Sequence, residues 1–224
     1  TVFHEALKGV AVKDVAIAGF SLIVLDDSGD VWVYGTNRRH LLAVDSLDIA
    51  YPRKLQLNDK IVGLSACNDN TMLLTSRGEC LRIGEYDEYP WFYGEYYQNP
   101  EKYKYIAKLE APPEIKQVCC DGKRIIFLSK DGKVFATGRN EKGCLGVGQE
   151  DYTNITVPKL VSGLNNIVSI TTSQDSSFAI DTNGNLWAWG SNFGGNLGDG
   201  TDIDRKIPVR VPNIANVTKV CLGF

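Results

Sequence analysis

The stretch SSFAIDTNGNLWAWG, residues 176–190, decides the fold, because three other stretches repeat its pattern without a gap. They are SLIVLDDSGDVWVYG (21–35), NTMLLTSRGECLRIG (70–84) and RIIFLSKDGKVFATG (124–138). Each has an apolar run, a polar turn that contains a glycine, and a second apolar run that ends in another glycine. The turn glycines, Gly29, Gly78, Gly132 and Gly184, are 49, 54 and 52 residues apart, and the closing glycines are Gly35, Gly84, Gly138 and Gly190. A period of this length predicts a repeat architecture.

Each unit has the sequence of a β-hairpin. The pairs Asp131-Gly132 and Asn183-Gly184 supply the positive φ angles that tight hairpin turns require. The flanking runs are short and rich in Val, Ile, Leu, Phe and Trp, and the near-continuous apolar run at 22–25 is typical of a strand covered on both faces. Helical periodicity is weak throughout. The sequence therefore predicts an all-β fold of sheets packed face to face, as in the blades of a β-propeller.

The loop after the closing glycine carries a family resemblance. Residues 138–148 and 190–200 match nearly position for position, and each unit then reaches a proline: Pro52, Pro112, Pro158 or Pro208. The pattern W-x-W-G-x-N-x-x-G-x-L-G-x-G-T, complete at 187–201, resembles the repeat of the regulator of chromosome condensation (RCC1-type) family. The resemblance extends over about residues 12–224. It implies a propeller of four-stranded blades, of which the family usually has seven.

Two departures from that family affect the interpretation. Eukaryotic members typically have histidine eight residues before the turn glycine, where this chain has Ser21, Asn70, Arg124 and Ser176, and the wording of the last unit resembles bacterial repeats. The repeat cores lie near 15–50, 61–84, 115–148 and 167–200, in one domain over 1–224. VTKVCLGF, at 217–224, parallels VAIAGF at 15–20 and so opens a fifth unit. The sequence is compatible with a four-bladed ring and with part of a longer propeller, and we favour the longer propeller.

The second unit contains an insertion at residues 85–105. The distance from closing glycine to proline is 28 residues there, against 17, 20 and 18 in the other units. Seven of the ten tyrosines lie in it, with Trp91, Phe92 and five acidic residues. The rings could pack as a small cluster that caps the blade, or they could form a recognition surface, since Tyr and Trp dominate binding hot spots. The acidic residues would then select a basic partner.

The sequence therefore predicts a protein–protein interaction scaffold that binds through loops on a propeller face. The predicted contacts are Tyr86, Tyr89, Trp91, Phe92, Tyr93, Tyr96 and Tyr97, with Arg38, Arg39 and His40 as a second group. The alternative is a guanine nucleotide exchange factor for a small GTPase of Ran or Rab type, which the resemblance implies because the family's founder acts on Ran. A bacterial effector that acts on a host GTPase would fit both the repeats and this activity.

Catalytic, cofactor and metal sites are not expected. His4 and His40 have no identifiable nucleophile partner, so we predict no enzyme active site. The acidic groups Asp26-Asp27-Asp30 and Asp199 to Asp204 lack the spacing of a calcium loop, and we interpret them as solvated turns. The glycine-rich loop at 190–200 lacks the Lys-Ser/Thr of a phosphate loop and is interpreted as structural.

Composition restricts the partner and the location. A net charge of −3 without a Lys/Arg run argues against direct nucleic-acid binding. The sequence contains no run of 18 apolar residues, so we expect no membrane span, and its first residues show no signal peptide. Six cysteines without a C-x-x-C pair are interpreted as reduced core residues. These features predict a cytoplasmic protein, in the host cytosol if it is a translocated effector, with secretion left open.

Overall fold

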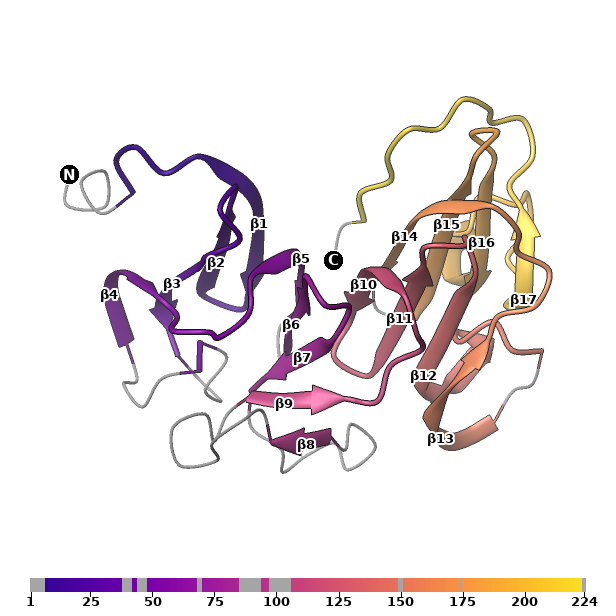
Figure 1. Ribbon diagram of the computed structural model, residues 1–224. Coiled ribbons are helices and arrows are strands. Elements are labelled where there is room, and N and C mark those ends of the chain that lie inside the picture. The colour runs from indigo at the N-terminus through magenta and orange to yellow at the C-terminus, as the bar shows by residue number, and fades with distance from the viewer. Residues whose placement is uncertain are drawn as a thin grey trace. The chain divides into compact units, whose positions relative to one another are not determined.

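The computed structural model describes residues 7–37, 42–43, 48–67, 70–84, 94–96, 106–148, 151–173 and 175–222, with the backbone alone at 94–96 and 151–153. The chain divides into two compact units, Thr1–Glu110 and Ala111–Phe224, and each contains two antiparallel sheets. We number the four sheets as blades 1 to 4 in chain order (Figure 1). The expectation of one domain over 1–224 stays a prediction.

In each blade the strands lie side by side from an inner to an outer strand. Blade 1 has β1 (Val12–Ala18), β2 (Ser21–Asp26), β3 (Val31–Thr36) and β4 (Asp48–Lys54), and blade 2 has β5 (Ile61–Cys67), β6 (Asn70–Thr75), β7 (Cys80–Ile83), β9 (Ile106–Leu109) and β8 (Gly94–Tyr96). Blade 3 has β10 (Ile115–Cys120), β11 (Arg124–Ser129), β12 (Val134–Asn140) and β13 (Asp151–Leu160), and blade 4 has β14 (Ile167–Ser173), β15 (Ser176–Asp181), β16 (Leu186–Gly190) and β17 (Arg205–Arg210). The described residues contain no α-helix, only the 3₁₀ turns η2 (Glu141–Gly143) and η3 (Phe193–Gly195). The predicted all-β fold is confirmed.

The four quoted stretches form the middle hairpin of each blade. In blade 4 the last ladder pair before the turn is Ile180 with Leu186, and blade 1 has Leu25 with Val31 at the same place. The turn glycines have φ between +72° and +81°, a conformation that L side chains rarely adopt. Strands β6, β11 and β15 are buried at every position. The near-continuous apolar runs correctly predicted this.

Within each unit, the turn glycine joins one blade to the next. The N–H of Ile61 donates to the Gly29 carbonyl at 2.9 Å in the first unit, and Ile167 donates to Gly132 at 3.1 Å in the second. Apolar side chains from both blades of each pair then form one core. In the second unit, the side-chain amide of Gln117 also pairs with the backbone N–H and C=O of Ile170, at 3.0 and 2.9 Å.

Residues 214–222 lie on the face of blade 4 that is opposite blade 3, where the inner strand of a next blade would lie. The N–H of Val217 donates to the Gly184 carbonyl at 3.0 Å, which repeats the hydrogen bond of Ile61 and Ile167. Val217, Val220 and Leu222 pack on the apolar residues of that face. The sequence at 217–222 thus behaves as the opening of a further unit.

Candidate interaction surface at the loop ends of the blades

Each blade has two ends, and one of them carries the long connections. We call the end with the tight hairpin turn the turn end, and the end with the closing glycine the loop end. The connections from inner to second strand and from third to fourth strand both lie at the loop end. The connection from closing glycine to proline at this end differs in length between the blades, so the loop end is the candidate functional surface.

The closing glycine holds these two connections together. The residue after it donates its N–H to the carbonyl of the first connection in three blades: Thr36 to Phe20 at 3.3 Å, Arg139 to Lys123 at 3.0 Å and Ser191 to Asp175 at 2.8 Å. A Cβ at Gly35, Gly138 or Gly190 would overlap that same carbonyl oxygen, and the φ angles there are +111°, +111° and +102°. Only glycine allows this approach.

A buried asparagine fixes the loop that follows. The side-chain carbonyl of Asn37, Asn140 and Asn192 accepts the N–H of the leucine five residues later, at 2.8, 3.1 and 2.9 Å. Those leucines, Leu42, Leu145 and Leu197, are buried in the blade core. The Asn-Leu pair therefore closes the loop and anchors it, so the predicted structural role of the glycine-rich loop is supported at the contacts that the structure describes.

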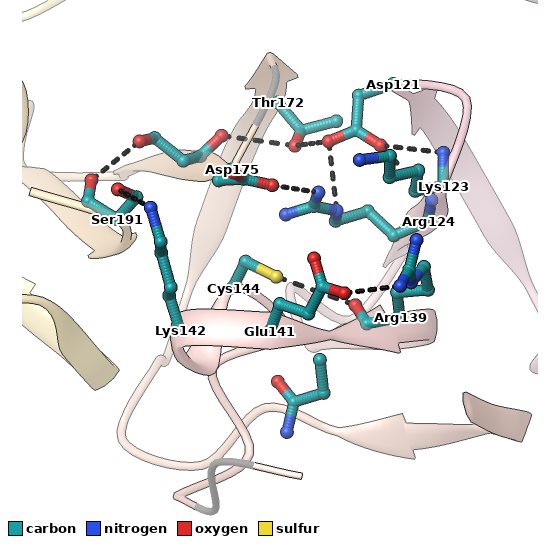
Figure 2. A network of polar contacts seen from close by, with 12 residues as sticks. Asp121, Lys123, Arg124, Arg139, Glu141, Lys142, Cys144, Thr172, Asp175 and Ser191 are labelled. Carbon is teal, nitrogen blue, oxygen red and sulfur yellow. Dashed lines mark hydrogen bonds and ion pairs between the residues drawn. The ribbon is translucent and has the colours of Figure 1, made fainter. Parts of the chain in front are cut away.

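The loop ends of blades 3 and 4 share a buried charge network (Figure 2). Arg124 opens β11, and its side chain is 1% exposed. Its Nε lies 3.0 Å from Oδ2 of Asp121 in its own blade, and its Nη2 donates to Oδ1 of Asp175 in blade 4 at 2.8 Å. Asp121 also accepts the backbone N–H groups of Lys123 and Arg124, and Thr172 of β14 donates its hydroxyl to it at 3.4 Å. Arg124 thus ties the loop ends of two blades together.

Burial and charge shift the pKa values in this network. Burial raises the pKa of Asp121, although the Arg124 guanidinium and two backbone N–H groups lower it in part. Burial alone would also raise the pKa of Asp175, but its hydrogen bond to Arg124 and the charges of Arg124, Lys123 and Lys142 bring it below the ordinary value. Burial raises the pKa of the neighbouring Cys144 thiol to about 11. Cys144 is therefore a protonated core thiol and not a nucleophile.

The sequence analysis missed the role of Arg124. It occupies the position eight residues before the turn glycine, where the other blades have Ser21, Asn70 and Ser176. Ser21 donates its hydroxyl to the carbonyl of Thr36, Ser176 donates to Ser191 at 2.8 Å, and Asn70 accepts from Arg82. The sequence signal that could have revealed this role is a charged residue at the start of an otherwise apolar strand, three positions after an aspartate.

The acidic turns need a correction, because their key carboxylates are buried. Asp26 is 7% exposed and accepts the N–H groups of Ser28 and Asp30 and the indole N–H of Trp32, each at 2.9 Å. Asp181 organises its own turn in the same way, with Trp187 as the indole donor. In both turns, the aspartate six residues before the tryptophan thus stabilises the turn by accepting backbone and indole N–H groups.

Asp199 needs the same correction. It accepts hydrogen bonds from Thr201, Asn192 and Arg205. Although burial alone would raise it, the pKa of Asp199 is lowered to about 2 by hydrogen bonds from the side chain and backbone of Thr201, from Arg205 and from Asn192. Over the part of the chain that the structure describes, no three His, Cys, Asp or Glu side chains group as a metal site.

Most predicted contact residues lie outside the described residues: Tyr86, Tyr89, Trp91, Phe92, Tyr93, Tyr97, Arg38, Arg39 and His40. Tyr96 lies on β8, and its backbone is opposite Ala107 of β9. Strand β8 extends blade 2 beyond its outer strand β9, so part of the insertion adds a fifth strand to that sheet. The predicted contact roles of these residues stay predictions.

All six cysteines are free, and Cys221 is exposed rather than in the core. No helix among the described residues is long and apolar enough to cross a membrane.

Repeated four-stranded blades joined through their turn glycines define a β-propeller repeat protein. The family model of the regulator of chromosome condensation (RCC1) repeat matches residues 131–180 and 183–223, and a second model of this repeat matches 167–196. Residues 131–223 are therefore similar to the repeats of this family.

The chain spans about half the length of each of three similar proteins. It is 25% identical over 237 residues to the ultraviolet-B receptor UVR8 of Arabidopsis thaliana, with 98% of the chain and 51% of the receptor covered. It is 22% identical over 232 residues to the regulator of chromosome condensation of Xenopus laevis, with 95% and 54% covered. The solved structure of Prp20p from Saccharomyces cerevisiae matches with a TM-score of 0.73 at 17% identity, over 92% of this chain and 51% of that one. This structural likeness shows the fold.

Proposed function

We propose that this chain is a protein–protein interaction scaffold whose contacts lie at the loop ends and at the outer edge of blade 2. The observation that carries the proposal is a contrast between blades. Blades 1, 3 and 4 fix the loop after the closing glycine with a buried Asn-Leu pair, whereas blade 2 has the 85–105 insertion there. A rigid scaffold that carries one long and chemically distinct excursion is a common basis for recognition.

The composition of the insertion supports a protein partner. Trp91, Phe92 and Tyr93 immediately precede β8, which is the outermost strand of its sheet. Aromatic side chains give large contact area at low entropic cost, and the surrounding acidic residues favour a basic partner surface. The same acidic residues disfavour a nucleic-acid partner.

The test is a triple substitution, Trp91→Ala, Phe92→Ala and Tyr93→Ala, read out by quantitative pull-down. The matched control is Tyr51→Ala with Val62→Ala, which removes two exposed side chains of the first unit that lie on β4 and at the turn end of β5. We expect the triple variant to lose partner proteins that the control retains, while both keep the circular dichroism of the parent. Unchanged recovery would overturn the binding role, and a loss of folded protein confined to the triple variant would support the packing role instead.

A second candidate function is guanine nucleotide exchange on a small GTPase of Ran or Rab type. It is favoured by the alignment with the Xenopus regulator over 95% of the chain, and by the binding of Prp20p to Gsp1p and histones that accompanies its solved structure. Exchange stabilises the nucleotide-free GTPase and needs no acid–base machinery. A bacterial effector that acts on a GTPase in the host cytosol is one version of this second candidate function. Release of labelled GDP from Ran- and Rab-type GTPases tests it, and no acceleration at micromolar protein would eliminate it for those GTPases.

A further inference from the structure

The fourth strand carries a proline in three blades and an isoleucine in blade 2. The pairing register identifies the counterpart positions, because one position of the third strand pairs in every blade with the same point of the fourth strand: Lys54, Lys108, Leu160 or Arg210. Two residues before these, the fourth strands have Pro52, Ile106, Pro158 and Pro208. Pro112 follows the end of β9 and is therefore not the counterpart of the other three prolines.

The three prolines lie on strands that form the edges of their sheets. Strands β4, β13 and β17 each close a four-stranded sheet, whereas β9 lies between β7 and β8 in the five-stranded sheet of blade 2 (Figure 1). The strands with proline also have a register shift against the third strand, whereas the described pairs of β7 with β9 run without one. Proline removes a main-chain N–H, and proline and bulge both protect a sheet edge from further pairing.

The main-chain N–H of Ile106 faces the side of β9 on which β8 lies. In the other blades, the residue three positions after the proline donates its N–H to the third strand at 2.8 Å: Leu55 to Val31, Val161 to Val134 and Val211 to Leu186. Leu109 is the counterpart in blade 2, where it pairs with Cys80. Main-chain groups alternate in direction along an antiparallel ladder, so those of Lys108 and Ile106 point away from β7. Lys108 is in turn opposite Glu95 of β8.

We propose that Ile106 is a positioning residue for the binding insertion, because a residue with a main-chain N–H at this position lets β8 pair with β9. The described ladder between them joins residues 94–96 to 107–109, so it is short and the loss of a donor beside it weakens it. Residues 91–93 directly precede β8, so its pairing fixes the point at which the aromatic run joins the sheet. This inference rests on the proposed scaffold function and adds the residue that holds the binding segment to its blade.

The test is hydrogen exchange of the Glu95 amide in the full chain with Ile106→Pro. Three blades fold with proline at this position, so we expect the β6 amides to stay as protected as in the parent. Exchange at Glu95 should accelerate about tenfold, which is equivalent to about 1.4 kcal/mol. Ile106→Ala is the matched control: the Ile106 side chain is 2% exposed, so alanine removes more packed apolar atoms than proline does but keeps the N–H. Glu95 should stay protected in that variant.

Partner recovery is the second readout. Ile106→Pro should lose the partner proteins that Ile106→Ala retains in the quantitative pull-down. Glu95→Pro removes the donor on β8 itself and leaves β9 and the blade core intact. It should expose the Lys108 amide to exchange and lose the same partners, even if Ile106→Pro impairs the folding of blade 2.

Three results would overturn the inference. They are a Glu95 amide that stays as protected in Ile106→Pro as in the parent, equal loss of its protection in Ile106→Ala, and unchanged partner recovery after that protection is lost. The proposed scaffold function fails separately, through unchanged recovery with the triple alanine variant of residues 91–93, whereas exchange at Glu95 is measured without a partner.

Discussion

Replacement of Arg124 by methionine should destabilise the second unit by about 3–5 kcal/mol. The guanidinium is almost fully buried, and its two partners are Asp121, which is 3% exposed, and Asp175, which is 33% exposed. Methionine fills much of the same volume but leaves the Asp121 carboxylate buried beside no cation. Removal of one partner from a buried pair costs about 3–5 kcal/mol, because an uncompensated charge remains. Lys133→Met, which removes an exposed cation paired with Asp131 in the same blade, should leave the stability nearly unchanged, because solvent screens this pair.

The cost of Arg124→Met should depend on pH. Loss of Arg124 removes a charge that lowers the pKa of Asp121, so the pKa in the folded state rises further above the unfolded value of about 3.9. A carboxyl group with a raised folded pKa destabilises the fold above that pKa and is neutral below the unfolded pKa. The difference between variant and parent should therefore narrow as the pH falls from about 7 toward about 4.

Urea denaturation followed by tryptophan fluorescence measures these effects, since Trp187 and Trp189 lie in blade 4. The double variant Arg124→Met with Asp121→Asn removes both charges, and it should be more stable than Arg124→Met alone. A single variant that costs less than about 1 kcal/mol at neutral pH would refute the reasoning. So would a double variant that is no more stable than the single one.

Three further substitutions test the loop end. Gly190→Ala should prevent stable folding of blade 4, because its Cβ would overlap the Asp175 carbonyl, while Gly163→Ala, with φ +87° and open space, should cost only about 1–2 kcal/mol in thermal denaturation. Asn140→Ala should cost about 1–3 kcal/mol in the same measurement, because the N–H of a buried leucine loses its partner. Asp199→Asn should cost about 2 kcal/mol at neutral pH, and urea midpoints should show this loss disappearing as the pH falls from about 4 through 2, where the carboxylate of the parent becomes protonated.

The hairpins and the loop were predictable from sequence because each depends on residues close together in the chain. A turn glycine, a closing glycine six positions later and an apolar run on either side define local conformations that recur in every unit. The burial of β6, β11 and β15 at every position followed from the near-continuous apolar runs. The Asn-Leu closure of the loop spans only five residues, so its sequence signal was visible in three units.

One contact that the sequence did not reveal connects residues about fifty positions apart. Arg124 and Asp175 meet only because two blades pack side by side, and neither residue matches a motif. Asp26 was interpreted as a solvated turn residue because Asp favours turns in general. In the structure it is buried, and its carboxylate accepts the indole N–H of Trp32.

The residue at one sequence position adds an ion pair between the loop ends of blades 3 and 4. Eight residues before the turn glycine, Ser21 and Ser176 donate within their own blade, where their bonds reach the carbonyl one residue past the closing glycine. Arg124 at the same position is long enough to reach Asp175 in the next blade. Because this ion pair is buried, it fixes the first connections of blades 3 and 4 relative to each other. The loop at 192–200 follows directly from Ser191, whose N–H is held by the Asp175 carbonyl. Arg124 therefore helps to hold the backbone from which the loop after the closing glycine of blade 4 begins.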